Sequence, residues 1–158
     1  MIKPYAAVGL IPTVRGIRKR ADIRINLEHL EHLAKAAMWL SSLDLPVRLI
    51  AIPEGALQAF NDEVLDLDHI TFARECAIDI PGEETKALAR IAQEYDAYVM
   101  AQAKARHPDL PDRFFNVGFI LDPAGDGAWL CRSVRTRSAS SLASPASDLA
   151  REVVWRSR

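Results

Sequence analysis

The side chain in this sequence that is best placed for chemistry is Glu54, which follows an apolar run over residues 47–53. The run has the length and the β-branched content of a buried strand, and Pro53 and Gly55 mark its end. In α/β proteins, ligands gather where such strands end, because the loops there surround a common crevice. The sequence therefore makes Glu54 the first candidate for a site residue, although the strand pattern alone favours a purely structural role. The alternative is that Glu54 only begins a loop or caps a following helix.

The other residues able to bind a metal or attack a substrate do not form a recognisable site. Cys76 and Cys131 are far apart and neither belongs to a CxxC motif, which argues against a disulfide framework and a zinc site. His29 and His32 share one side of a predicted helix, but no third metal ligand accompanies them. We therefore expect no metal and no cofactor, with Cys76 as a small core residue and the two histidines on a polar surface.

A basic cluster lies at residues 15–20 and an acidic one at residues 62–68. The basic cluster could contact phosphate or an acidic substrate, but such clusters are more often solvated loops. The acidic cluster lacks the glycine and the terminal glutamate of a calcium-binding loop, so we expect it to be a solvated loop. The members of the basic cluster are Arg15, Arg18, Lys19 and Arg20.

The composition is that of an ordinary globular domain. The chain has 158 residues, of which 49% are hydrophobic and 26% are charged, and its net charge is -1. This is enough chain for one hydrophobic core. No apolar run approaches the ~20 residues of a membrane span, and the N-terminus does not resemble a signal peptide. With two separate cysteines, a reducing cytoplasm is the expected location, with no membrane partner.

The composition changes near Gly127. Residues 127–158 hold six arginines against Asp148 and Glu152, a net charge of +4, so the rest of the chain carries -5. Seven of the nine serines lie in this tail, and all five lysines precede it. We therefore predict two parts, residues 1–126 and a divergent Arg-, Ser- and Ala-rich tail. We expect no nucleic acid as a partner, because the tail arginines are not interleaved with aromatic residues and the whole chain is slightly acidic.

Hydrophobic periodicity predicts an α/β fold. Apolar runs at residues 5–12 and 47–53 predict two buried strands, and a helix with Asn26 as its N-cap connects them, ending at about Leu43. This strand–helix–strand order is a βαβ-like unit. Downstream we expect a short helix at 69–78, a helix with an acid-rich start after Pro81, a third strand at 97–101, a loop at 107–112, a fourth strand at 114–121, a hairpin turn at 122–127 and a returning strand from 128.

Four segments, taken in order, resemble the N-terminal half of the nitrilase, or carbon–nitrogen hydrolase, superfamily. They are IAIPEGAL (residues 50–57), IPGEET (80–85), YVMA (98–101) and FNVGFILDPAG (115–125). The resemblance implies a partial α-β-β-α sandwich. It also implies hydrolysis of a non-peptide C–N bond in a small-molecule amide, nitrile or carbamoyl substrate, without a cofactor, in a family whose members usually pair into homo-oligomers.

The chemistry of that family uses a glutamate, a lysine and a cysteine. The thiol attacks the carbonyl or nitrile carbon, the carboxylate transfers the protons, and the positive charge of the lysine stabilises the tetrahedral intermediate. By motif, Glu54 matches the glutamate. Asn116 matches a residue that is common in this part of the family, and we expect it to be structural.

The other two catalytic positions are not found. The lysine should lie near Arg132–Ser133, but no lysine follows Lys104. Arg132 or Arg135 has the right charge, yet a planar guanidinium does not replace an ammonium in a tight site. In the family, the nucleophilic cysteine lies tens of residues after the lysine, in a strand-to-helix turn. Cys76 and Cys131 both precede the expected lysine position, so neither has that context.

We therefore expect a chain that lacks the lysine and the cysteine and is inactive alone. It has about half the usual family length, and gain of Arg, Ser and Ala with loss of Lys after Gly127 is what a GC-rich gene gives when read out of frame. One hypothesis is a truncated, frameshifted hydrolase. The other is a non-catalytic α/β half-domain that pairs with another chain, which could supply the lysine and the cysteine. Both hypotheses predict uncovered sheet edges and an uncovered apolar face.

Overall fold

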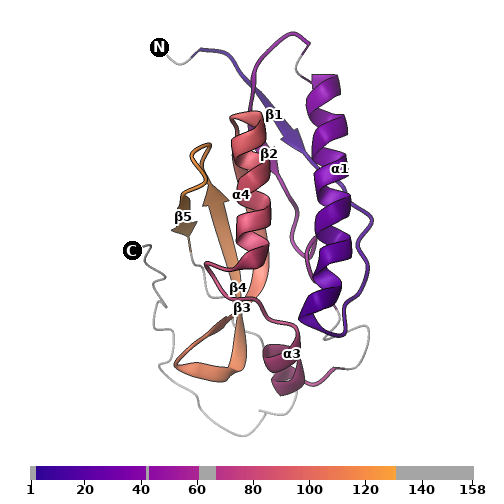
Figure 1. Cartoon of the computed structure of the whole chain (residues 1–158), viewed down its shortest axis with the longest axis vertical. Coiled ribbons are helices and arrows are strands. Elements are labelled where there is room, and N and C mark those ends of the chain that lie inside the picture. Colours follow the sequence, from indigo (N-terminus) through magenta and orange to yellow (C-terminus); the bar gives the residue numbers. More distant parts are fainter. Residues whose placement is uncertain (1–2, 42, 61–66, 131–158) are drawn as a thin grey trace, which may run out of the picture.

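The computed structural model of the chain describes residues 3–41, 43–60 and 67–130. This part of the chain forms one five-stranded sheet and a layer of helices (Figure 1). The strands are β1 (Ala6–Gly9), β2 (Val47–Ala51), β3 (Tyr98–His107), β4 (Leu110–Leu121) and β5 (Gly127–Leu130). The helices are the short 3-10 helix η1 (Arg20–Asp22), α1 (Ile23–Ser41), α3 (His69–Glu75) and α4 (Glu83–Tyr95). The predicted α/β class is confirmed.

The strands follow one another across the sheet in chain order. β1, β2 and β3 are parallel, whereas β4 and β5 run antiparallel to their neighbours. Helix-containing connections join the parallel strands and tight turns join the antiparallel ones, as the geometry of each pairing requires. The predicted hairpin turn at 122–127 is confirmed, because Leu121 pairs with Gly127 and the Asp122 N–H donates to the Asp126 carbonyl at 2.9 Å.

The predicted loop at residues 107–112 is wrong. β3 and β4 extend into it and leave only a two-residue turn, Pro108-Asp109. Pro111, which suggested a loop, is accommodated in β4 because the register shifts beside it and residues 111–113 have no partner in β3. β3 and β4 therefore form a long hairpin, and β3 is twice as long as the predicted third strand, ten residues instead of five.

Helices α1 and α4 lie side by side over one face of the sheet (Figure 1). Side chains alternate between the two faces of a strand, and the helix-facing residues of β3 are small and buried. They are Val99, Ala101, Ala103 and Ala105. On the opposite face, Tyr98 and Met100 keep 48% and 42% of their surface exposed. The described residues thus leave this face uncovered around Tyr98 and Met100, as expected for part of the face.

Asn26 is not the N-cap of the first helix. η1 and α1 begin upstream of it, and Asn26 is buried inside the helix, where its side chain joins three segments. Its Oδ1 accepts the Arg15 N–H at 2.9 Å, and its Nδ2 donates to the carbonyls of Arg15 and Leu57 at 2.8 and 2.9 Å. An N-cap and a buried asparagine use the same hydrogen-bonding capacity, so the local sequence did not separate them.

The two later helices largely match expectation. α3 is shorter than predicted and ends at Glu75, while α4 begins at Glu83 with two carboxylates in its first turn, as its acidic start predicted. None of the described helices is long and apolar enough to cross a membrane. Several predictions fall outside the described residues. They concern the acids at 62–66, and Cys131, Arg132, Ser133, Arg135, Arg137 and the rest of the tail.

Candidate active site

Glu54 lies where β2 ends, as the sequence predicts. β2 itself stops at Ala51, and the Ile52 N–H still donates to the Met100 carbonyl of β3 at 2.8 Å. Two residues later the chain leaves the sheet, so the Glu54 side chain is exposed while Gly55 is buried. A carboxylate at this position can reach both solvent and the neighbouring strands, as a catalytic base must.

A closed ring of hydrogen bonds holds Glu54. Asn116 Nδ2 of β4 donates to Glu54 Oε1 at 3.2 Å. Gln102 Nε2 of β3 donates to Asn116 Oδ1 at 3.0 Å, and Gln102 Oε1 accepts the backbone N–H of Gly55 at 3.1 Å. The ring therefore brings together Glu54 and Asn116, which motif resemblance had singled out, and adds Gln102, which it had not.

Gly55 allows the chain to turn directly after Glu54. Its φ is +78°, a backbone conformation that favours glycine, and a Cβ on it would lie 2.8 Å from the ring of Phe60. The Ala59 N–H donates to the Gly55 carbonyl at 2.7 Å, which closes the turn. Residues 54–60 thus form a compact loop, with Phe60 folded back over its start.

Gln58 fixes the far end of this loop to β3. Its Oε1 accepts the Lys104 N–H at 2.7 Å, and its Nε2 donates to the carbonyls of Lys104 and Cys76 at 2.9 and 2.8 Å. Gln58 is fully buried, so these bonds satisfy groups that water does not reach. The loop bearing Glu54 is therefore tied to β3 at both Gln102 and Lys104.

Lys104 is a buried cation among aromatic rings. It is 5% exposed, and its Nζ lies 4.7 Å from the ring centroid of Phe72 and 5.6 Å from those of Phe60 and Phe114. The negative ring faces attract the ammonium, and the interaction strengthens when water is excluded. Lys104 pairs in register with Asn116, so both side chains are on the sheet face that carries the Glu54 ring.

Cys76 is a core residue, as predicted. It is buried, and burial raises the pKa of its thiol to about 11, so the reactive thiolate is disfavoured near neutral pH. Its role in the Glu54 loop is played by its carbonyl oxygen, which binds Gln58. No group of three or more metal-ligating side chains occurs within the described ranges, and His29 and His32 stay without a third ligand there.

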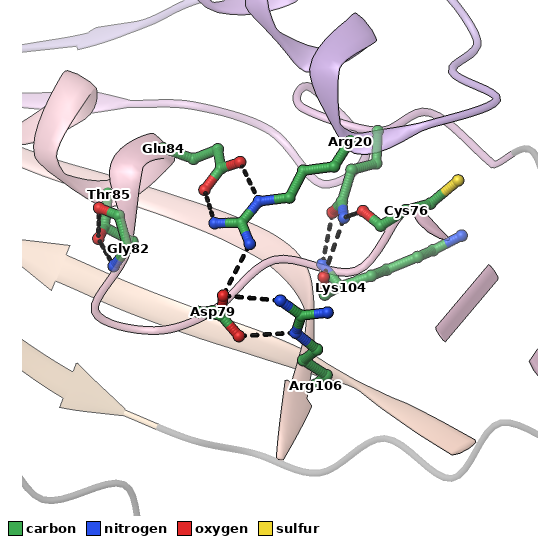
Figure 2. Close-up of polar contacts among 9 residues, drawn as sticks. Arg20, Cys76, Asp79, Gly82, Glu84, Thr85, Lys104 and Arg106 are labelled. Carbon is green, nitrogen blue, oxygen red and sulfur yellow. Dashed lines mark hydrogen bonds and ion pairs between the residues drawn. The ribbon is translucent and has the colours of Figure 1, made fainter. Parts of the chain in front are cut away.

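A second polar cluster lies at the start of α4 (Figure 2). Arg20 forms a two-pronged pair with Glu84 at 2.7 and 2.8 Å and a further bond with Asp79 at 2.7 Å. Arg106 of β3 binds the same Asp79 at 2.7 and 2.9 Å. Figure 2 shows Arg20 between Glu84 and Asp79, with Arg106 on the other side of Asp79. Arg20 is therefore neither a ligand-binding residue nor part of a solvated loop, the two interpretations of the basic cluster. It forms ion pairs with carboxylates of its own chain.

Charge pairing shifts the titration of this cluster. Hydrogen bonds from Arg106, and secondarily from Arg20, lower the pKa of Asp79 to about 2. The hydrogen bond to Glu84 raises the pKa of Arg20. An open groove of about 790 Å³ borders the cluster between the first turns of α1 and α4, and its lining does not include Glu54, Asn116 or Gln102. The groove is separate from the Glu54 ring.

The fold and this ring agree with the comparison of the sequence with known families. The model of the carbon-nitrogen hydrolase family matches residues 6–151. The chain belongs to the carbon-nitrogen hydrolase family. The matched range covers the Glu54 loop and both strands that hold it, and it runs past Gly127.

Several solved structures share the fold. XC1258 from Xanthomonas campestris, a CN-hydrolase superfamily protein with an arsenic adduct in its active site, is 18% identical with a TM-score of 0.52, over 75% of this chain and 38% of its own. Nit3 of Saccharomyces cerevisiae, from branch 10 of the superfamily, is 16% identical with a TM-score of 0.51, over 73% and 41%. An N-terminal amidase with a Gln-Val peptide is 12% identical with a TM-score of 0.53, over 77% and 25%.

These identities establish a common fold and nothing about substrate. The chain spans 25% to 41% of the length of these three structures. The described residues contain one sheet with α1 and α4 on one face and with Phe72 of α3 against Lys104 on the other, which is part of an α-β-β-α sandwich. The predicted family and the predicted partial fold are both confirmed.

Proposed function

We propose that this chain is the glutamate-bearing part of a carbon–nitrogen hydrolase, with Glu54 as the general base. The substrate class is a small-molecule amide, nitrile or carbamoyl compound. The observation that supports the proposal is the placement of Glu54 at the end of β2, where Asn116 donates to one carboxylate oxygen. A base that transfers protons needs a fixed position and an accessible oxygen, and Glu54 combines this anchor with an exposed side chain.

We also propose that the 158-residue chain does not turn over substrate alone. The acyl-transfer chemistry of the family needs a thiolate and a lysine cation beside the glutamate. No lysine follows Lys104, and Lys104 itself is enclosed by three phenylalanine rings. The buried Cys76, with its raised pKa, is a poor nucleophile.

An amide and nitrile hydrolysis assay tests the proposed inactivity and, wherever turnover occurs, the role of Glu54. We would compare the wild-type chain with Glu54→Gln and with the control Glu83→Gln, which alters an exposed carboxylate in the first turn of α4. The expected result is no release of ammonia above background from any of the three. Turnover that only Glu54→Gln abolishes would disprove inactivity and support Glu54 as the base. Equal turnover in all three would contradict both proposals.

A second candidate function is a non-catalytic half-domain that pairs with another chain. The uncovered face of the sheet favours it, because exposed apolar strands such as that of Tyr98 and Met100 are suited to packing against a second sheet. The partner would be a chain that carries the lysine and the cysteine. Appearance of turnover on mixing with such a chain, and its loss with Glu54→Gln, would support this function.

From the change in composition near Gly127 we also propose that the gene is frameshifted there, and the family match that continues to residue 151 is the observation against it. Translating the nucleotide sequence from about codon 115 in all three frames tests it. A lysine shortly after the Asp122-Pro123-Ala124-Gly125 turn and a later cysteine in another frame would support a frameshift. Their absence from every frame would make the arginine-rich tail a genuine part of the protein.

A further inference from the structure

In the ring of hydrogen bonds at Glu54, the order of donors and acceptors has a fixed direction. That direction is set by a backbone N–H. It contains the Gly55 N–H, both ends of the Gln102 amide, both ends of the Asn116 amide and Glu54 Oε1. Gln102 and Asn116 are both partly buried, on neighbouring strands and on the same face of the sheet. Each side-chain amide has an oxygen that only accepts and an NH₂ group that only donates. Rotating one amide by 180° therefore exchanges the donor and the acceptor that it presents to the next residue.

The direction follows from one group that cannot be reversed. A backbone N–H can only donate, so Gly55 requires the carbonyl oxygen of the Gln102 amide. The Gln102 amide then donates from its NH₂ group to Asn116, so Asn116 must accept this hydrogen bond with Oδ1. Asn116 is left with its own NH₂ group toward Glu54. The residue after Glu54 thus determines, through two side chains, that Glu54 meets a donor.

We propose that Gln102 is a positioning residue for Glu54, acting through Asn116. This inference rests on the proposed role of Glu54 as the base. Gln102 orients the Asn116 amide so that its NH₂ group donates to Glu54 Oε1. Glu54 Oε2 makes no hydrogen bond to another described residue, which leaves that oxygen to accept a proton. Gln102 does not touch the reacting atoms, and neither Gln102 nor Asn116 is required to change protonation.

The substitution Gln102→Glu tests the direction with almost no change in shape. A carboxylate at 102 still accepts the Gly55 N–H but cannot donate to Asn116. Asn116 must turn its NH₂ group toward residue 102 and its oxygen toward Glu54, where two acceptors then face each other. We expect the unfolding equilibrium constant, from urea denaturation, to rise by about 3- to 10-fold, within the range for residues coupled in one network.

The double variant Glu54→Gln/Gln102→Glu should restore the ring in the opposite direction. The amide at 54 can donate to the turned Asn116 oxygen, so every donor again meets an acceptor. We expect Gln102→Glu to change the unfolding constant by less than about twofold in the Glu54→Gln background. If the first variant fails to fold, the double variant should still fold. An equal cost in both backgrounds would overturn the proposal.

Repulsion between two carboxylates could also produce this rescue, so a second readout is needed. In the wild-type chain, NMR should show nuclear Overhauser contacts from the Asn116 NH₂ protons to the Glu54 side chain. In Gln102→Glu and in the double variant, these contacts should move to residue 102. The control Gln102→Met removes both amide bonds, and Glu54→Gln should not rescue it. Rescue of Gln102→Glu without movement of the Asn116 contacts would overturn the proposal.

None of these measurements requires turnover. A failure of the ring experiment would therefore leave the assay of Glu54 untouched. Conversely, if the chain is active and Glu54→Gln leaves its turnover unchanged, Glu54 has no catalytic role. The directed ring of hydrogen bonds would still stand. The two results can be told apart in the same purified chain.

Discussion

At the scale of single residues, the position of Glu54 depends on its neighbour. Gly55 has a positive φ, donates to Gln102 and lies beneath the Phe60 ring. The positive φ and the Phe60 ring favour a residue without a side chain at the first turn of the loop, whereas any residue except proline could donate its N–H to Gln102. The family resemblance of the Pro53-Glu54-Gly55 segment therefore has a local physical reason, which is the sharp exit from β2.

We expect Gly55→Ala to destabilise the protein by about 1–3 kcal/mol, because the new Cβ meets Phe60 at 2.8 Å and the backbone conformation disfavours a side chain. Urea denaturation measures this change. Gly9→Ala is the matched control, since nothing lies within 4 Å of a Cβ there, and it should change stability by no more than about 0.5 kcal/mol. Similar effects of the two variants would contradict the role given to Gly55.

Motif and strand pattern predicted Glu54 and Asn116 but not the residues that position them. Gln102 and Lys104 alternate with small residues along β3, a pattern that equally fits polar side chains facing water. Their functions come from segments distant in sequence, namely the loop at 54–60, α3 and β4. A single sequence does not specify which distant rings will surround a lysine, so Lys104 gave no signal.

At the scale of elements, the Arg20 cluster connects η1, α4 and β3. The Glu84 carboxylate is only 6% exposed, and Arg20 binds it with two nitrogens. Removing one partner of a buried ion pair leaves an uncompensated charge, which costs more than the pair itself contributes. The start of α4 is therefore held by a residue more than sixty positions earlier in the chain.

We expect Arg20→Ala to lower the free energy of unfolding by about 3 kcal/mol or more, because Glu84 loses its counter-charge. Arg24→Ala is the control. Arg24 is 79% exposed and pairs loosely with Glu28 at 3.5 Å, so its loss should cost about 0.5 kcal/mol or less. Thermal or urea denaturation compares them. Equal losses would show that Arg20 is a surface arginine in solution.

Asp79 should make the stability depend on pH. Its pKa in the folded chain is about 2, below the ordinary 3.8, so its pairing stabilises the fold above about pH 4. That contribution is lost as the pH falls from about 4 to about 2. We expect Asp79→Asn to lose less stability than the wild type between pH 5 and pH 2, as measured by urea midpoints.

The control for this pH effect is Lys86→Gln, which removes an exposed cation of α4 that has no ion pair among the described residues. It should keep the wild-type pH dependence. Because Asp79 is about half exposed, solvent screening reduces the effect, and the comparison rests on the slopes and not on absolute free energies. Identical slopes for Asp79→Asn and wild type would rule out the pairing as a source of acid sensitivity.

The elements themselves were largely predictable, because apolar periodicity is a local signal. It placed β1, β2, α1 and α4 and the turn after Leu121. It failed at Asn26 and at residues 107–112, where the outcome depends on a partner elsewhere. Asn26 donates to the carbonyls of Arg15 and Leu57, and the hairpin near Pro111 exists because β3 pairs with β4 across the register shift.

At the scale of the whole molecule, α1 and α4 cover one face of the sheet, whereas on the other face α3 and the Glu54 loop cover the Lys104 end and the described residues leave Tyr98 and Met100 exposed. Tyr98 and Met100 lie on that second face, which in an α-β-β-α sandwich packs against another sheet. In a solution of this chain alone, the available partner sheet is that of a second copy. The fold therefore predicts self-association through the face that the rest of a sandwich would cover.

We expect sedimentation velocity to show a weight-average coefficient that rises with protein concentration. The double variant Tyr98→Thr/Met100→Thr should reduce this rise, because it removes apolar area from the face while threonine keeps the strand propensity. Ile11→Thr is the control: Ile11 is 93% exposed but lies outside the sheet, so its substitution should leave association unchanged. Association that responds to Ile11→Thr and not to the sheet variant would place the contact elsewhere on the molecule. If the wild-type chain stays monomeric at every concentration, the exposed face does not drive association. The proposed half-domain function would then lose its physical support.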